Sequence, residues 1–284
     1  GQNEAQKRII DGDDVINQCQ APFNSVVNFI RVRGTTITEL CTGTLLTQDI
    51  VVTSGSCVEA MNDNDLPTYF AVLGDKYYKQ FDVGQPNNFP EQRISIAAVK
   101  LHPDHDATTD NENMANNIAI VKLASSAVLD EFCVQPMTRY DSFTDTSCRP
   151  FSETCRIYAD VELTTNINVA RFILAQNYSG ETLVDGITMI ATRLTDTFVG
   201  TCRYDFGSMV ACLDDDGNYV LRGILSNHDK CGRAPPLTMI GQSLVDPGRP
   251  MYVVDVEMYK GWIDGCIANF NACAGSSPPA DTKK

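Results

Sequence analysis

The stretch that decides the fold is residues 202–212, Cys-Arg-Tyr-Asp-Phe-Gly-Ser-Met-Val-Ala-Cys. A turn built on Asp-Asp-Asp-Gly follows it, and a second strand-like run, Val-Leu-Arg-Gly-Ile-Leu-Ser, occupies 220–226. The middle residue, Phe206, carries a phenyl ring, which has no lone pair and no ionisable proton. Phe206 therefore cannot attack a carbonyl group as a nucleophile.

The length and charge of the chain limit what kind of protein it can be. Its 284 residues fit one large all-β unit or two smaller barrels. An apolar fraction of 43 % is ordinary for a globular protein. The net charge of -14 argues against nucleic acid and anionic lipid as partners, because both attract basic surfaces. No run reaches the ~18 apolar residues of a membrane-spanning helix.

The cysteine content indicates the compartment. The chain has 11 cysteines, many of them flanking strand-like runs, which points to an oxidising, extracellular setting. The sequon Asn177-Tyr-Ser is consistent with secretion and glycosylation. Because the start of the chain is polar, we expect that any signal peptide has been removed. No Cys or His cluster has zinc spacing, so we expect no metal site and no cofactor. The loop Asp75–Glu91 has few acidic residues, and the sequence leaves calcium binding there open.

Three further motifs occur along the chain in a fixed order. Residues 41–57 read Cys-Thr-Gly-Thr-Leu-Leu and end in Thr-Ser-Gly-Ser-Cys, and residues 116–123 read Asn-Asn-Ile-Ala-Ile-Val-Lys-Leu. Residues 223–228 read Gly-Ile-Leu-Ser-Asn-His. Together with 202–212, these motifs resemble those of the chymotrypsin-like serine proteases, and the resemblance covers roughly 9–270.

The resemblance implies the fold and its boundaries. We expect an all-β fold of two six-stranded Greek-key β-barrels packed face to face, with a C-terminal α-helix. Its parts are an activation-peptide-like segment at 1–8, barrels at 9–130 and 131–258, a helix at 259–270 and a flexible tail at 271–284.

The resemblance also implies that all three triad positions are substituted. Ser56 stands where the general-base histidine belongs, Asn117 where its orienting aspartate belongs, and Phe206 where the nucleophilic serine belongs. A hydroxyl cannot take a proton as an imidazole does, so we expect no enzymatic activity. A relocated site using Ser54, Ser56 or Ser208 is a remote alternative.

The neighbouring positions differ from an active protease as well. Tyr204 replaces the oxyanion-hole glycine, and the former specificity pocket would contain Gly200, Asn227 and His228. His228 is the only histidine that we expect near the old cleft. The side chains of Tyr204, Phe206 and His228 either form an aromatic patch for a partner or fill the cleft. If they fill it, we expect the binding surfaces to lie on the loops 59–67, 104–117 and 140–154.

The resemblance also implies an activation switch and a disulfide framework. A freed amine on Ile9, after cleavage at Arg8, would pair with Asp205, unless Lys7-Arg8 is merely part of a solvated tail. The resemblance implies three disulfides, Cys41–Cys57, Cys155–Cys212 and Cys202–Cys231. Cys133 is expected to bridge to the terminal helix region, and Cys19, Cys148, Cys266 and Cys273 are unassigned. Because the total is odd, at least one thiol is free or bonded to another molecule.

These observations predict a secreted, non-catalytic serine protease homologue. Its expected role is binding or regulation, as a cofactor, decoy or inhibitor in a proteolytic or innate-immune pathway, with an unidentified protein as partner. The alternative is a structural or assembly subunit joined to other chains through the odd cysteine.

Overall fold

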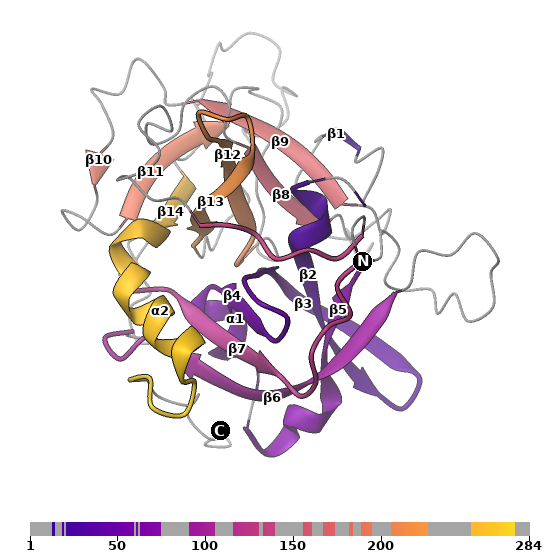
Figure 1. The fold of residues 1–284 in the computed structure, drawn as a ribbon. Coiled ribbons are helices and arrows are strands. Elements are labelled where there is room, and N and C mark those ends of the chain that lie inside the picture. The colour runs from indigo at the N-terminus through magenta and orange to yellow at the C-terminus, as the bar shows by residue number, and fades with distance from the viewer. Residues whose placement is uncertain are drawn as a thin grey trace, which may run out of the picture.

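The computed structural model shows two β-sheet units stacked on one another, with a helix at the C-terminal end (Figure 1). It describes residues 13–14, 19, 21–59, 61, 63–74, 91–105, 116–130, 133–139, 156–160, 167–173, 182–183, 189–194, 206–226 and 251–275. Two stacked β-sheet units with a C-terminal helix match the chymotrypsin-like architecture expected from the sequence.

Six antiparallel strands form the first unit, which is a closed barrel in the order β2-β3-β4-β7-β6-β5. The strands are β2 (Val26–Arg33), β3 (Thr36–Leu45), β4 (Ile50–Thr53), β5 (Tyr69–Leu73), β6 (Gln92–Leu101) and β7 (Ala119–Leu123). Helix α1 (Gly55–Glu59) follows β4, and two 3-10 helices, η1 (Phe23–Ser25) and η2 (Asp63–Thr68), precede β2 and β5. Closure leaves this barrel without an unpaired edge.

The second unit is an eight-stranded sheet, β1-β9-β8-β12-β13-β14-β11-β10. Its strands are β1 (Asp13–Asp14), β8 (Arg156–Asp160), β9 (Ile167–Ile173), β10 (Thr182–Leu183), β11 (Met189–Leu194), β12 (Met209–Leu213), β13 (Tyr219–Leu225) and β14 (Met251–Asp255). An additional pairing of β9 with β11 closes the six strands from β9 to β11 into a ring, and the short strands β1 and β10 lie outside it. The ring corresponds to the expected second six-stranded barrel.

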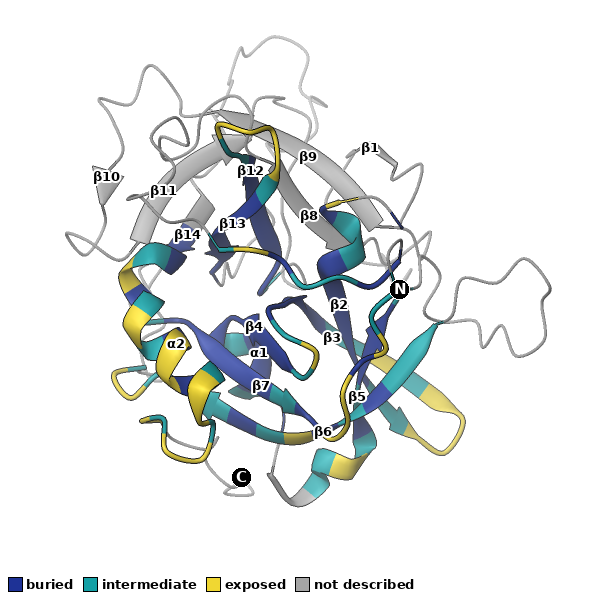
Figure 2. Ribbon diagram, in the orientation of Figure 1, coloured by how far each residue is buried: buried dark blue, intermediate teal, exposed yellow. Residues whose placement is uncertain are grey.

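Alternation along two central strands explains how the units pack. In β4, Val51 belongs to the core inside the first barrel, whereas Ile50 and Val52 belong to the core shared with the second sheet. In β7, Val121 points inward and Ile120 points toward the second sheet in the same way. Because successive side chains point to opposite faces of a strand, these uninterrupted apolar runs bury both faces (Figure 2).

The shared core also holds the C-terminal helix. Helix α2 (Lys260–Ala268) follows the 3-10 helix η3 (Val256–Tyr259), and it places Ile263 and Cys266 in the core between the units. Asp255 caps η3, because its carboxylate accepts a hydrogen bond from the Glu257 amide at 3.1 Å.

Beyond the helix, residues 271–275 are attached to the first barrel, which differs from the flexible tail expected from the sequence. Lys100 of β6 donates to the Cys273 carbonyl and lies over the Phe270 ring. Trp262 donates from Nε1 to the Ala274 carbonyl at 2.7 Å. Residues 276–284 lie outside the described part of the chain.

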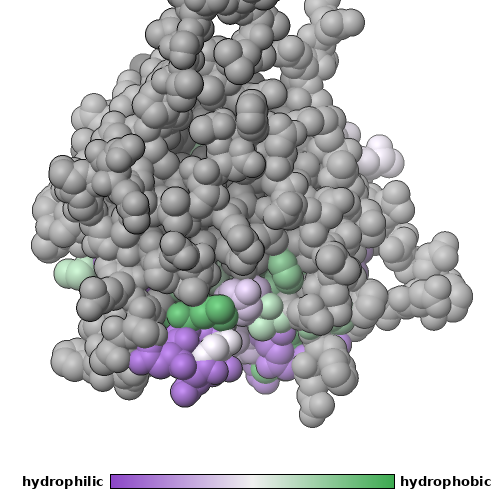
Figure 3. All heavy atoms as spheres, turned by 90° about the horizontal axis from the view of Figure 1, so that it is seen from above, coloured by the Kyte–Doolittle hydropathy of each residue, from purple (hydrophilic) through white to green (hydrophobic). Residues whose placement is uncertain are grey.

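The surface of the second unit is described only in part. In the view from above, most of the coloured atoms gather at one edge, where hydrophilic residues lie beside a few hydrophobic ones (Figure 3). Among the described residues, no helix is both long enough and apolar enough to cross a membrane.

Candidate functional site

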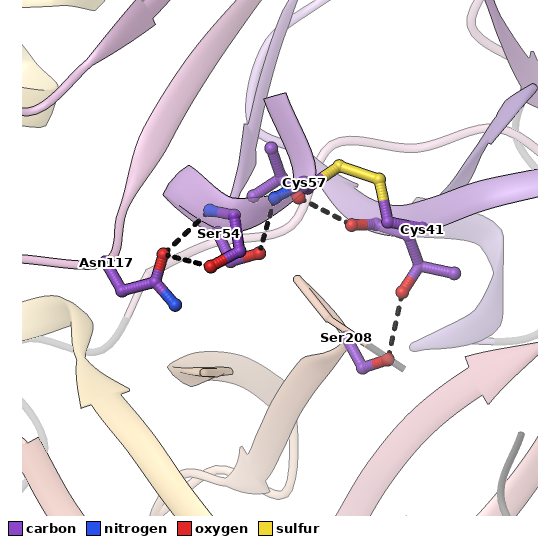
Figure 4. Close-up of a disulfide and its surroundings, with 8 residues drawn as sticks. Cys41, Ser54, Cys57, Asn117 and Ser208 are labelled. Atoms are coloured by element: carbon purple, nitrogen blue, oxygen red, sulfur yellow. Dashed lines mark hydrogen bonds between the residues drawn. A yellow bond between two sulfur atoms is a disulfide. The ribbon is translucent and has the colours of Figure 1, made fainter. Parts of the chain in front are cut away.

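Four short segments meet where the two units contact each other (Figure 4). Ser54 lies between β4 and α1, Ser56 is in α1, Asn117 precedes β7, and Ser208 precedes β12. Ser226, which directly follows β13, completes the group. The structure thus brings together the sequence-predicted positions 56, 117 and 208 from both units.

Asn117 is the centre of this group and is fully buried. Its Oδ1 accepts hydrogen bonds from the Ser56 amide at 2.8 Å and from the Ser56 hydroxyl at 3.1 Å. Its Nδ2 donates to the Ser226 hydroxyl at 2.8 Å. Donors on one side and an acceptor on the other fix the orientation of the amide. An amide stays neutral, so this position supplies no negative charge to the site.

The turn that carries Phe206 is held by backbone contacts to both units. The Phe206 carbonyl accepts from the Thr42 amide at 3.1 Å, and the Gly207 amide donates to the Leu225 carbonyl at 3.0 Å. Buried Ser208 shares a hydrogen bond of 2.9 Å with the Thr42 hydroxyl. The phenyl ring of Phe206 is half-buried and packs against the core of the first barrel. The described contacts of Phe206 therefore include apolar packing.

Gly207 allows this turn to come so close to the first barrel. It has a φ of +76°, in the left-handed region that glycine adopts without strain. A Cβ atom there would overlap Thr53 Oγ1 and the Thr42 carbonyl oxygen. Only glycine fits this position without a shift of its neighbours.

His105 is a site residue that the sequence analysis missed, and this corrects the expectation that His228 alone lies near the cleft. Its ring packs on Gly55, where an added Cβ would lie 2.7 Å from His105 Cε1 and 3.0 Å from Asn117 Oδ1. His105 Nδ1 lies 3.2 Å from the Asn116 carbonyl, and Nε2 contacts the Glu59 carboxylate. The only sequence signal was its position shortly before the Asn-Asn-Ile-Ala motif, because the contact with Glu59 spans 46 residues.

A second histidine lies on the same segment. His102 packs edge to face with Tyr259 and Trp262, at centroid distances of 5.1 Å and 4.9 Å. Burial lowers the pKa of the His102 imidazole, the Asp104 carboxylate opposes this shift, and the charge of His105 adds to it.

The disulfides agree with the predicted framework in part. Cys41 pairs with Cys57, as the resemblance implies, and Cys212 is disulfide-bonded, although its partner lies outside the described residues. The expected bridge from Cys133 to the helix region is wrong, because Cys133 pairs with Cys19. The chain after Cys133 runs along η1, where the Gln135 amide donates to Asn24, and this brings Cys133 beside the N-terminal segment.

The two helix-region cysteines, Cys266 and Cys273, pair with each other. Several predicted site residues lie outside the described part of the chain, and so does the loop 75–90. They are Arg8, Ile9, Cys148, Cys155, Asn177, Gly200, Cys202, Tyr204, Asp205, Asn227, His228 and Cys231. Among the side chains that are described, no cluster of His, Cys, Asp or Glu is arranged to hold a metal ion.

Comparison with known proteins settles the family. The family model described as Trypsin matches residues 12–241. The chain belongs to the trypsin family. Its fold is also similar to that of mouse neuropsin, a serine protease, with a TM-score of 0.62 and 21 % identity over 90 % of this chain and 99 % of that one.

Relatives within the trypsin family include proteins described as proteases and proteins described as inactive. The chain is 24 % identical to bovine chymotrypsin-like elastase family member 1, covering 94 % of this chain and 92 % of the relative. It is 21 % identical to the inactive serine protease scarface of Drosophila melanogaster, covering 83 % of this chain and 34 % of the relative. It is 28 % identical to the inactive CLIP domain-containing serine protease A28 of Anopheles gambiae, covering 68 % and 50 %.

Proposed function

We propose that this member of the trypsin family is non-catalytic and acts as a secreted binding or regulatory protein. In this proposal it serves as a cofactor, decoy or inhibitor in a proteolytic or innate-immune pathway. The single observation that carries the proposal is the hydrogen-bonded group Ser56–Asn117–Ser226, in which a neutral amide takes the central place.

Acyl transfer by a serine protease requires a nucleophile, a base that removes its proton and an acid that stabilises the charged base. The Ser56 hydroxyl donates its hydrogen to Asn117, and a hydroxyl has no tendency to bind a second proton near pH 7. The amide of Asn117 has no charge with which to stabilise a cation. These properties support the assignment of Ser56, Asn117 and Phe206 as vacated triad positions.

His105 does not supply the missing general base. Both ring nitrogens of His105 face acceptors, the Asn116 carbonyl and the Glu59 carboxylate, so neither is directed at a serine hydroxyl. Ser208, the alternative nucleophile, is fully buried and shares its hydroxyl with Thr42. A hydrolase with a relocated site is therefore the weakest of the three interpretations.

An active-site fluorophosphonate probe tests the proposal. We expect no mass increase in the intact protein after incubation at pH 7.5, while an active trypsin-family protease in the same buffer is labelled completely. A variant that restores the three positions, Ser56→His, Asn117→Asp and Phe206→Ser, shares the disulfides and serves as the matched comparison. Stoichiometric labelling of the unaltered protein would overturn the proposal.

Secretion and a protein partner are part of the same proposal. Disulfides in both halves of the chain, at Cys41–Cys57 and Cys266–Cys273, are consistent with an oxidising compartment. Capture from the native extracellular fluid, followed by mass spectrometry without reducing agent, should recover a non-covalent protein partner.

The odd number of cysteines favours one second candidate, a subunit of a covalent extracellular assembly. The same capture experiment separates the two. A complex that dissociates only after reduction supports assembly through the odd cysteine, whereas a monomeric mass with one free or capped thiol supports the regulatory role.

A further inference from the structure

The histidines at 102 and 105 connect the C-terminal helix to α1 through a closed set of contacts. His102 packs on Tyr259, and the Tyr259 hydroxyl donates to Asn116 Oδ1 at 3.0 Å. The Asn116 carbonyl faces His105, and the His105 amide donates to the His102 carbonyl at 2.9 Å. Asn116 has a φ of +59°, a conformation that asparagine tolerates better than most residues.

The His105 contacts require a proton. A backbone carbonyl only accepts hydrogen bonds, so Nδ1 must donate to Asn116. Nε2 then either donates to the ionised Glu59 carboxylate or accepts from a protonated one. In both cases the His105–Glu59 pair holds one proton between the two side chains, and the His105 side chain is only 1 % exposed. Losing this proton would leave two acceptors facing each other in a buried place.

The His102 contacts have the opposite requirement. Its side chain is 12 % exposed and packs edge to face against the rings of Tyr259 and Trp262. These rings solvate a cation less well than water does. Nδ1 of His102 accepts from the Asp104 amide at 3.3 Å, a bond that needs the lone pair of the neutral ring. A proton on His102 therefore opposes its packing.

We propose that the segment Leu101–His105 is a pH-sensitive link between two helices. It contacts the C-terminal helix through neutral His102, and it contacts α1 through the His105–Glu59 pair, which shares one proton. Acidification protonates His102, and the helix then opens locally together with the disulfide-linked segment 269–275, while the contact with α1 remains. In the described part of the chain, the charged or titratable groups facing the two imidazoles are Glu59 from α1, Tyr259 from η3, Asp104 on the segment itself, and each other.

Trp262 provides a direct readout, because it is the only tryptophan in the chain and touches His102. We expect Trp262 fluorescence to change between pH 7.5 and 4.5, with a midpoint below the ~6.5 of a free histidine. Hydrogen exchange of the α2 amides, corrected for intrinsic rates, should accelerate over the same range. The exchange rate should increase about tenfold in total for each pH unit by which the midpoint lies below that of a free histidine.

Two variants separate the histidines. His102→Phe keeps an aromatic ring without a titrating group, so both transitions should disappear, and His102→Gln serves if the phenyl ring does not fit. Glu59→Gln lets an amide donate to neutral His105 without the shared proton, and the transition at His102 should remain. A midpoint above ~6.5, or a transition that persists in both His102 variants, would overturn the proposal.

Discussion

Replacing Gly207 by alanine tests whether the turn around Phe206 is fixed by packing. The left-handed φ of +76° costs a residue with a Cβ about 1–2 kcal/mol. The new methyl group would also overlap Thr53 Oγ1, which now donates to the Thr42 carbonyl at 2.6 Å in a fully buried place. Breaking that hydrogen bond and leaving a buried group unpaired costs about 1–3 kcal/mol more.

Together, the two effects should lower the free energy of unfolding of Gly207→Ala by about 2–5 kcal/mol, a large part of the ~5–15 kcal/mol that stabilises a typical domain. The assay is equilibrium unfolding in urea, comparing midpoints at constant slope. Gly217→Ala is the matched control, because Gly217 has a φ of +81° but nothing within 4 Å of an added Cβ. Gly217→Ala should lose only the part of the unfolding free energy that comes from backbone strain at the left-handed φ. If both variants lost the same free energy, the packing argument would be refuted.

Two further variants test the second unit and the C-terminal segment. Arg222→Met removes one partner of a buried ion pair with Asp255 and should cost about 3–5 kcal/mol, whereas adding Asp255→Asn should restore most of it. Burial already raises the pKa of the Asp255 carboxyl, so the native state binds this proton more readily than the unfolded state. The loss from Arg222→Met should therefore shrink as pH falls toward that pKa, which a denaturation series from pH 7 to 4 measures. Replacing Cys266 and Cys273 by serine opens a loop with a sequence separation of 7 and should cost about 2 kcal/mol, and an unchanged urea midpoint would contradict this.

The sequence predicted much of the fold because its landmarks are local. Each motif combines an apolar run with a glycine or cysteine at a fixed place in the run, as at Gly207 and Cys41. Such patterns identify strands and turns without knowledge of distant contacts. They do not reveal which distant cysteines meet, and the assignment of Cys133 was wrong for that reason.

The sequence by itself determined the family-like order of strands and the side chains at Ser56, Asn117 and Phe206. The tertiary structure alone decided what surrounds them. Asn117 meets Ser226 across 109 residues, and His105 meets Glu59 across 46. Chain folding creates these pairs by closing two sheets on a common core, and a hydrogen bond forms only between groups that the fold places about 3 Å apart. No periodicity along the chain records such a distance.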